Sequence, residues 1–322
     1  MKLSHFLSLA LIMTFNTQAK PVQLNLPGAG PIEFRTQSPI QSLRYGAKID
    51  DPRRHQAGFN RYSFQVIALS IWTQSPEYEM DYYTFDYQLE WEHQWQDGWK
   101  TEVSLSQRNT HESRLDQLTL SFHKLFGLNQ NDRDTVPKHR YRYWFRDYPI
   151  DETNFKNQTF SRAIELLIAK NIFQSNQQSW TVGITGHYEN DPRHQGWDHS
   201  LRTDYYYSLN AQHQLYSSLI YSTFRSQNFF NILLKNHLIT IGLSYEYQPV
   251  ANRSWVLQYL LNQGATVGLG QLGKPSHEFL IGHRWIRQQH QIEFAMIENL
   301  VNPDNSADIS FSLTYKYTPK QL

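Results

Sequence analysis

The sequence predicts an all-β fold, an antiparallel transmembrane β-barrel of about twelve strands. Three observations predict it: segments of about ten residues that alternate apolar and polar side chains, connections that alternate between short and long, and an N-terminal export signal. Alternation places the two sets of side chains on opposite faces of a strand. Strands of about nine to eleven residues suit a tilted bilayer crossing. A helical membrane protein is not indicated, because the mean hydropathy is -0.63.

Residues 1–19 are predicted to be a signal peptide. Lys2 supplies the positive start, residues 6–15 form a short apolar stretch, and Thr17-Gln18-Ala19 is a small-x-small cleavage site. We therefore expect Sec-type export and localisation in the outer membrane of a Gram-negative cell. Residues 20–58 follow as a periplasmic N-terminal segment, irregular because of its Pro and Gly residues, and it is a candidate plug for the barrel.

The stretch from Tyr82 to Thr110 is the clearest predicted hairpin. One face of its first arm is aromatic and apolar, whereas the other face carries Asp86, Glu90 and Glu92. Residues 96–98 provide the tight turn, and the return arm places Glu102 on the polar face. Carboxylates facing hydrocarbon are costly, so we expect the ring face to meet lipid and the charged face to meet the lumen.

Ten further segments complete the twelve predicted strands: 59–72, 161–173, 178–188, 201–209, 213–225, 235–248, 254–262, 277–287, 291–300 and 307–317. Short connections fall at 96–98, 174–177, 210–212, 249–253 and 287–290. Longer ones fall at 75–81, 111–160, 189–200, 226–234, 263–276 and 302–306. Short turns at one rim and long loops at the other are typical of an outer-membrane barrel. The barrel is thus predicted to span 59–317, with a C-terminal tail at 318–322.

The longest connection contains two exceptions to the pattern. Apolar residues at helical spacing predict one short amphipathic helix, with Leu115, Leu118, Phe122, Leu125 and Phe126 on its apolar face. Residues 138–146 then alternate again, with aromatic residues on one face and Lys138, Arg140, Arg142 and Arg146 on the other. We expect this stretch to stand above the membrane as an extension. If it crosses the membrane instead, the number of strands rises to fourteen.

Three stretches resemble a known family: "FHKLFGLNQNDRDTVPKHRYRYWF", "KPSHEFLIGHRW" and "IENLVNPDNSADISFSLTYKY". They are similar to the proteobacterial domain-of-unknown-function family 3187 (DUF3187), and the resemblance covers roughly residues 27–317. It implies an exported outer-membrane barrel of about this length without an established activity. No catalytic residue is implied by it.

Composition excludes several classes of function. The chain has no cysteine, so disulfides, thiolate catalysis and cysteine metal sites are excluded. The formal net charge of +1 gives no indication of nucleic-acid binding. No cofactor motif is present. The expected partners are outer-membrane lipid, the barrel-assembly machinery and a small polar solute.

The predicted lumen charges are the main candidate site. They are four carboxylates and four basic residues on neighbouring segments: Asp86, Glu90, Glu92, Glu102, Lys138, Arg140, Arg142 and Arg146. Opposite charges across a lumen would orient small polar solutes. The alternative is that the charges pair and fill a narrow lumen, which would make a closed, structural barrel.

Two weaker candidates lie at loop positions. His111 and Ser113 are spaced like the His-x-Ser of outer-membrane lipid hydrolases, and the alternative is a polar strand-to-loop junction. Asp191, His194, Asp198 and His199 are a candidate metal cluster, and the alternative is a solvated loop. The predicted function is binding or passage of small polar solutes. The alternatives are a lipid-modifying hydrolase and a structural or surface-interaction barrel, and an enzyme is the less favoured class.

Overall fold

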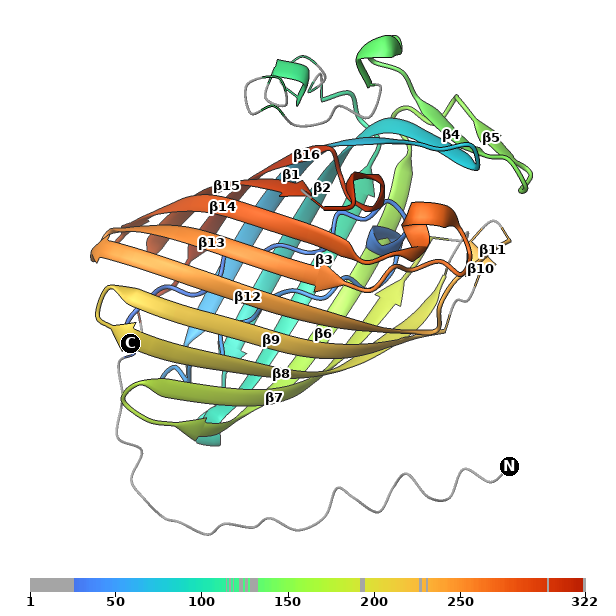
Figure 1. The fold of residues 1–322 in the computed structure, drawn as a ribbon. Helices are drawn as coiled ribbons and strands as arrows, with labels where there is room; N and C mark the ends of the chain where they lie inside the picture. Colours follow the sequence, from blue (N-terminus) through green and yellow to red (C-terminus); the bar gives the residue numbers. More distant parts are fainter. Residues whose placement is uncertain are drawn as a thin grey trace, which may run out of the picture.

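The computed structural model describes residues 26–320, apart from 114, 116, 118, 122–123, 125–126, 128–132, 192–194, 226–227, 230 and 300. Twelve antiparallel strands form a closed barrel (Figure 1). Their bounds are β1 (Asn60–Gln74), β2 (Tyr78–Gln94), β3 (Trp99–Asn109), β6 (Thr159–Gln174), β7 (Gln178–Glu189), β8 (Gly196–Asn210), β9 (His213–Phe224), β12 (His237–Val250), β13 (Arg253–Asn262), β14 (Ser276–Arg287), β15 (His290–Asn299) and β16 (Ile309–Tyr317).

The first and last strands close the barrel. β1 pairs with β16 from Tyr62 opposite Tyr317 to Ser70 opposite Ile309, and it pairs with β2 on its other edge. Closure satisfies every strand edge in the wall, as a membrane-spanning sheet requires. The twelve strands confirm the predicted fold class. The first long connection differs from the prediction, because β2 begins at Tyr78 and only residues 75–77 separate it from β1.

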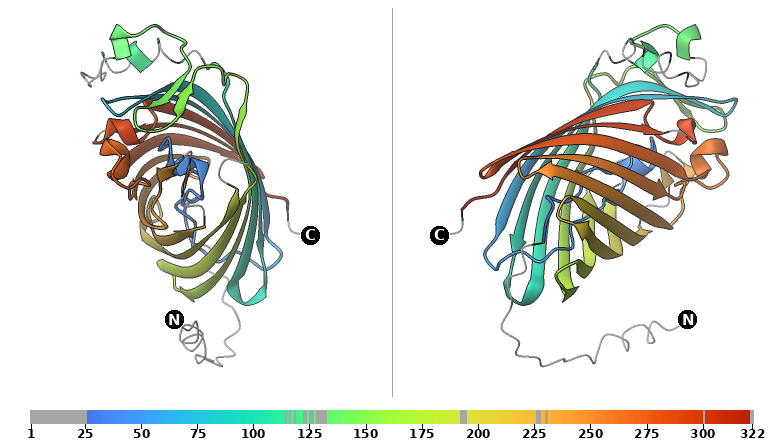
Figure 2. Two further views of the ribbon diagram at one scale, coloured as in Figure 1. Left: turned by 90° about the vertical axis from the view of Figure 1, so that its right-hand side faces the viewer. Right: turned by 60° about the vertical axis from the view of Figure 1, so that its left-hand side comes forward.

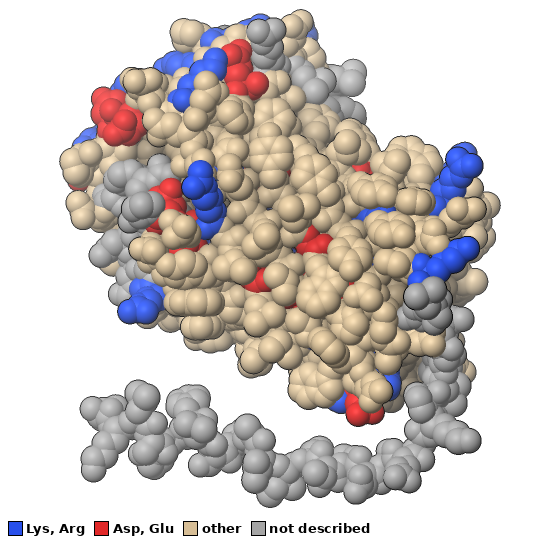
Figure 3. Space-filling model, turned by 180° about the vertical axis from the view of Figure 1, so that it is seen from behind, with Lys and Arg blue, Asp and Glu red and all other residues tan. Residues whose placement is uncertain are grey.

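The barrel wall is apolar outside and polar inside. Leu89, Ile184, Leu219 and Leu257 are among the large apolar side chains exposed on the outer face, each about half accessible. The intervening side chains are buried in the interior, and most of them are polar or charged. Figure 3 shows the consequence on the rear wall, where uncharged residues cover most of the middle, with a few small acidic patches, and Lys and Arg lie towards the ends. This wall is suited to a hydrocarbon layer.

Two short β-hairpins lie at the long-loop end of the barrel. β4 (Arg142–Phe145) pairs with the start of β2, and β5 (Ile150–Glu152) pairs with β4. This external hairpin stands beyond the barrel, so the wall has twelve strands and not fourteen. β10 (Asn228–Phe229) and β11 (Ile232–Leu233) form a second small hairpin. The described part of the chain also contains five short 3-10 turns: η1 (Gln41–Leu43), η2 (Gln96–Gly98), η3 (Arg133–Thr135), η4 (Gly270–Gly273) and η5 (Pro303–Asn305).

The predicted helix in the longest loop is described only in part. Gln117, 119–121 and Lys124 are helical, and the Thr119 N–H donates to the Leu115 carbonyl at 2.8 Å. Four of its five predicted apolar residues, Leu118, Phe122, Leu125 and Phe126, lie outside the described residues. In the part of the chain that the structure describes, no helix has the length and apolar character needed to cross a membrane.

Candidate functional site

Residues 26–59, which we call the internal segment, run inside the barrel (Figure 2). Near its start, the Ala29 N–H donates to Glu246 of β12 at 3.0 Å, close to the short-turn end. At its far point, Ser38 Oγ donates to Asn305 in the long-loop end at 2.6 Å. The segment then returns and leads into β1 at the short-turn end. It therefore fills the lumen as an irregular hairpin with both ends on the same side.

The wall carries glycines where the internal segment comes closest. A Cβ atom at Gly282 would lie 2.3 Å from Ile32 Cδ1, and one at Gly242 would lie 2.4 Å from Ile49 Cγ1. Real Cβ atoms do not approach other atoms so closely, so these positions hold the two isoleucines only because they lack a side chain. The fit shows that wall and segment are complementary in shape.

Several backbone N–H groups of the internal segment are bonded to side chains of the wall. Buried N–H groups must find acceptors, and this segment forms no regular strand or α-helix that would supply them. Wall side chains accept instead, at 2.5 to 3.3 Å, from the N–H groups of Ile32, Gln37, Tyr45 and Asp50; the acceptors are Gln258, Glu278, Asp198 and Ser218. The attachment is therefore polar along much of its length.

Lys48 of the internal segment is paired with three carboxylates in the lumen. Its Nζ lies 2.5 Å from Glu90 Oε2 and 2.5 Å from Glu102 Oε1, both on the wall. Glu33 of the segment itself lies 3.4 Å away. All four side chains are at most 9% exposed. Burial of a charge is costly without partners, so Lys48 and the wall carboxylates depend on each other.

Two further ion pairs join the internal segment to the wall. Arg35 binds Glu165 of β6 through two nitrogens, at 2.9 and 3.1 Å. Lys100 of β3 lies 2.5 Å from Asp50 of the segment. The fork of a guanidinium on a carboxylate fixes geometry as well as charge. Together with Lys48, these pairs fasten both limbs of the segment.

Other basic groups of the wall are paired within the wall. Arg284 lies 2.7 Å from both Glu246 and Glu293, and Arg202 lies 2.7 Å from Asp204. Each also donates to a carbonyl of the internal segment, Arg284 to Gly30 at 2.7 Å and Arg202 to Lys48 at 3.0 Å. These two arginines hold the segment through neutral acceptors.

The four predicted lumen carboxylates each meet a basic partner. Asp86 accepts from Arg108 Nε at 2.7 Å, and Glu92 pairs with Arg61. Glu90 and Glu102 share Lys48, as described above. Two of the four therefore depend on a residue of the internal segment.

The basic row of residues 138–146 does not line the lumen, contrary to the prediction. Arg140 pairs with Glu79 and Asp81 near the start of β2, and Arg142 of β4 lies 2.8 Å from Asp151 of β5. Lys138 and Arg146 are exposed. The reason is that the aromatic face of this stretch turns inward. Tyr141, Tyr143 and Phe145 are each at most 8% exposed, which leaves the basic face to water.

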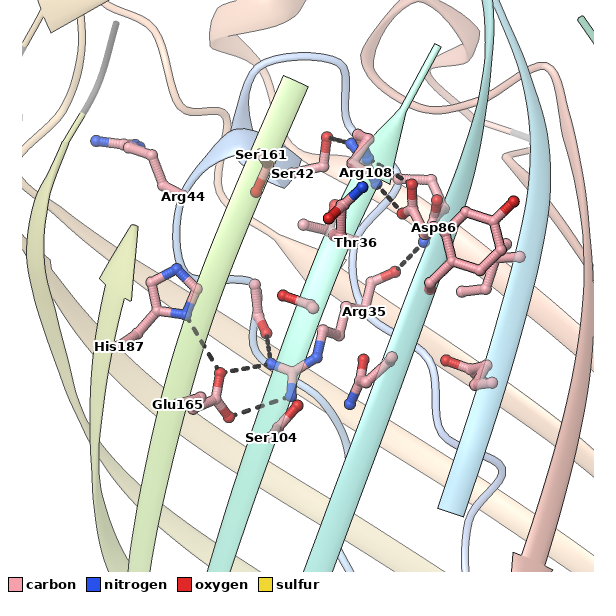
Figure 4. Close-up of a pocket in the computed structure, with 18 residues that line it drawn as sticks. Arg35, Thr36, Ser42, Arg44, Asp86, Ser104, Arg108, Ser161, Glu165 and His187 are labelled. Carbon is pink, nitrogen blue, oxygen red and sulfur yellow. Dashed lines mark hydrogen bonds and ion pairs between the residues drawn. The ribbon is translucent and has the colours of Figure 1, made fainter. Parts of the chain in front are cut away.

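A small cavity remains between the internal segment and strands β2, β3, β6 and β7 (Figure 4). Its volume is about 70 Å³, enough for a few water molecules. Arg35, Arg108, Glu165 and His187 line it with serine and glutamine side chains. His187 Nδ1 lies 3.4 Å from Glu165. Among the described residues, neither ring nitrogen of His187 forms a hydrogen bond.

His111 and Ser113 are not brought together as a catalytic pair. His111 Nδ1 lies 2.8 Å from Asn157 Oδ1, and Ser113 Oγ has no hydrogen-bond partner among the residues described. Glu112 between them pairs with Lys156 at 2.5 Å. The arrangement is that of a polar loop junction, and it lacks the nucleophile-to-base contact that serine catalysis needs.

The candidate metal residues are also separated. Asp198 points into the barrel and accepts from the Tyr45 N–H, whereas the next residue on β8, His199, is exposed and stacks on Trp197. Asp191 lies in the loop before β8, and His194 lies outside the described residues. Where the chain is described, no group of three or more His, Asp or Glu residues could hold a metal.

Sequence reasoning missed the basic residues that matter most in the lumen. Lys48 and Arg35 stand in an irregular segment, so no alternation assigns them to a face. Their partners Glu102 and Glu165 are 54 and 130 residues away. The inward positions of β3, β8 and β14 did contain a signal, because Lys100, Arg202 and Arg284 stand on polar faces.

A closed antiparallel barrel with an apolar outer wall and a charged interior is an outer-membrane β-barrel. The family to which the chain belongs is the one described as Protein of unknown function (DUF3187), whose model matches residues 7–318. No curated protein matches the sequence.

Comparison with solved structures finds similar proteins at low sequence identity. The COG4313 outer membrane channel from Pseudomonas putida F1 is similar with a TM-score of 0.55 and 11% identity, over 84% of this chain and 98% of that one. NanC porin gives a TM-score of 0.49 with 8% identity, over 80% and 98% of the two chains. KdgM porin gives 0.43 with 6% identity, over 81% and 99%. The first of these shows that the twelve-stranded fold is that of known outer-membrane barrels.

Proposed function

We propose that this protein is an outer-membrane channel for small polar solutes and that the internal segment is the plug that closes its lumen. The observation that carries the proposal is the polar attachment of residues 26–59 to a charged wall. Side chains alone fill barrels of about eight strands, whereas the lumen of this twelve-stranded barrel holds a whole hairpin of chain. The protein with a similar fold from Pseudomonas putida F1 is called an outer membrane channel, and we extend that class to this chain.

Many contacts of the plug are hydrogen bonds and ion pairs, which water can replace. Hydrogen bonds and ion pairs contribute little net free energy when both partners can be solvated instead. Because the internal segment begins and ends at the short-turn end, it can leave the lumen on that side without threading through the barrel. Displacement of the plug would leave a lumen lined by charged and polar side chains.

The proposal includes the route by which the protein reaches its membrane. Residues 1–19 act as a signal peptide for Sec-type export, and the barrel-assembly machinery inserts the strands. The apolar outer wall then contacts outer-membrane lipid. Exposed aromatic residues near the short turns, such as Trp95, Trp99 and Trp255, fit the interfacial belt of such barrels.

The test is a swelling assay on liposomes containing the refolded protein without residues 1–19. Liposomes are diluted into isotonic glycerol, arabinose or raffinose, and the decrease of light scattering gives the rate of entry. We expect entry of the small solutes to exceed that into protein-free liposomes, and raffinose to enter slowest. Solutes should enter faster through the variant Gly282→Leu, which crowds the internal segment, than through the wild-type protein. Rates equal to those of protein-free liposomes for both proteins would contradict a channel and favour the structural or surface barrel.

A further inference from the structure

The wall and the internal segment carry opposite excess charge. Inward-facing positions of the described barrel strands carry eleven acidic and six basic side chains, an excess of five negative charges. The acids are Asp86, Glu90, Glu92, Glu102, Glu165, Glu189, Asp198, Asp204, Glu246, Glu278 and Glu293; the bases are Arg61, Lys100, Arg108, Arg202, Arg284 and Lys316. The internal segment carries five Lys or Arg residues and three Asp or Glu residues, an excess of two positive charges.

The pairing shows which wall charges the internal segment covers. Five of the six wall bases contact an acid of the wall itself; the exception is Lys100, whose ion-pair partner is Asp50 of the segment. By contrast, the wall acids Glu90 and Glu102 take their cation from Lys48, and Glu165 takes Arg35. Departure of the segment would leave three wall carboxylates and one wall ammonium without their ion-pair partner.

Lys48 shows what chemistry the uncovered wall accepts. Its ammonium stands between Glu90 and Glu102, at 2.5 Å from each. An alkylammonium group is therefore held at this place by two wall carboxylates on neighbouring strands. Any free solute that ends in a primary ammonium offers the same group to the same oxygens.

We infer that the solutes of the open channel are cationic and that Lys48 occupies the position of a solute ammonium in the closed state. This inference rests on the proposed channel function and adds the class of solute to it. A solute ammonium that binds Glu90 and Glu102 competes with Lys48 and so favours departure of the internal segment. The wall excess of negative charge then raises the local concentration of cations along the lumen.

The test is a reversal-potential measurement on the refolded protein in a planar bilayer, first with a KCl gradient. The same measurement follows with n-butylammonium chloride and with potassium butanoate, two probes of similar size and opposite charge. We expect potassium and butylammonium to permeate more than chloride and butanoate. In the double variant Glu90→Gln/Glu102→Gln, the ratio of cation to anion permeability should decrease by about fivefold, as expected for the loss of a nearby charge in water.

The control variant is Glu79→Gln, which removes a carboxylate at the outer rim and should leave the ratio unchanged. Proper folding of each variant is checked by its heat-dependent shift on electrophoresis. Anion preference, or a ratio that is unchanged in the double variant, would overturn the inference and leave the channel function intact. No current from any folded variant, including Gly282→Leu, would contradict the channel function itself.

Discussion

Two pieces of chain pack onto the barrel and differ in how many of their contacts are polar. The internal segment, residues 26–59, lies in the lumen and is held by ion pairs and hydrogen bonds to wall side chains, with buried apolar side chains such as Ile32 and Ile49 between them. The external hairpin, β4 and β5, stands at the long-loop end (Figure 1) and is held by backbone pairing with β2 and by buried rings. Tyr143 of β4 lies 6.0 Å from Tyr82 of β2, centroid to centroid. Around them, Phe155 and Phe160 complete an aromatic cluster with centroids 5.4 Å apart.

The difference in contacts indicates which of the two pieces can detach from the barrel. Buried rings lose their contacts outright when they separate, and water does not replace them. Buried ion pairs exchange their partners for water or for another ion. We therefore expect the internal segment to detach reversibly and the external hairpin to stay in place.

The largest effect is expected from Lys48→Met, which removes the charge while keeping much of the side-chain length. Glu90 and Glu102 would remain buried in the closed state without their cation, and breaking a buried pair in this way costs about 3–5 kcal/mol. The closed state should lose most of its population. The open probability in planar bilayers measures the remaining population of the closed state. Lys138→Met, at an exposed external position, is the matched control, and equal open probability in both variants would refute the role of Lys48.

A similar loss of stability, confined to the external hairpin, is expected from Phe155→Ala. Truncation of a buried Phe costs about 3–5 kcal/mol, and Phe155 contacts Tyr82, Tyr141 and Phe160. Hydrogen exchange should rise at residues 142–152 while conductance keeps its wild-type value. An increase of conductance would show that the two regions are coupled, contrary to the comparison.

A smaller effect is expected from Gly282→Leu. Overpacking costs about 1–3 kcal/mol. Here it acts mainly on the closed state, because a Cβ at 282 would lie 2.3 Å from Ile32 of the internal segment, against 3.1 Å from Ala295 of the wall. Passage should increase about tenfold for each 1.4 kcal/mol. Adding Ile32→Ala should reverse the increase by making room. Gly186→Leu is the control, since a Cβ there meets only Trp197 within 4 Å.

The smallest effect is expected from Arg142→Gln. Its ion pair with Asp151 is exposed, and such pairs contribute about 0–1 kcal/mol. Ion selectivity and conductance should match those of the wild-type protein, because Arg142 lies on the external hairpin. A clear change of ion selectivity would indicate that the basic row lines the lumen after all.

The sequence predicted the barrel well, because a strand's two faces follow from alternation alone. The hairpin from Tyr82 to Thr110 illustrates this, since its carboxylates are inward and Leu89 and Leu105 are exposed. Alternation does not say which surroundings each face meets. Alternation alone therefore predicts Arg140 and Arg142 in the lumen. In the structure, the aromatic face of this stretch is buried, and the two arginines lie at the outer rim. Lys48 was missed because its partners are distant in sequence and its segment has no period.

The most direct test of the central claim is a reversible lock on the internal segment. Ser38→Cys and Asn305→Cys replace side chains whose oxygens lie 2.6 Å apart, and the chain has no other cysteine. Solute entry into liposomes is measured for the oxidised and the reduced double variant, with Ser38→Cys alone as control. The account predicts that oxidation abolishes entry and that reduction restores the wild-type rate. Equal entry in both states, with the disulfide confirmed by mass, would contradict a mobile plug.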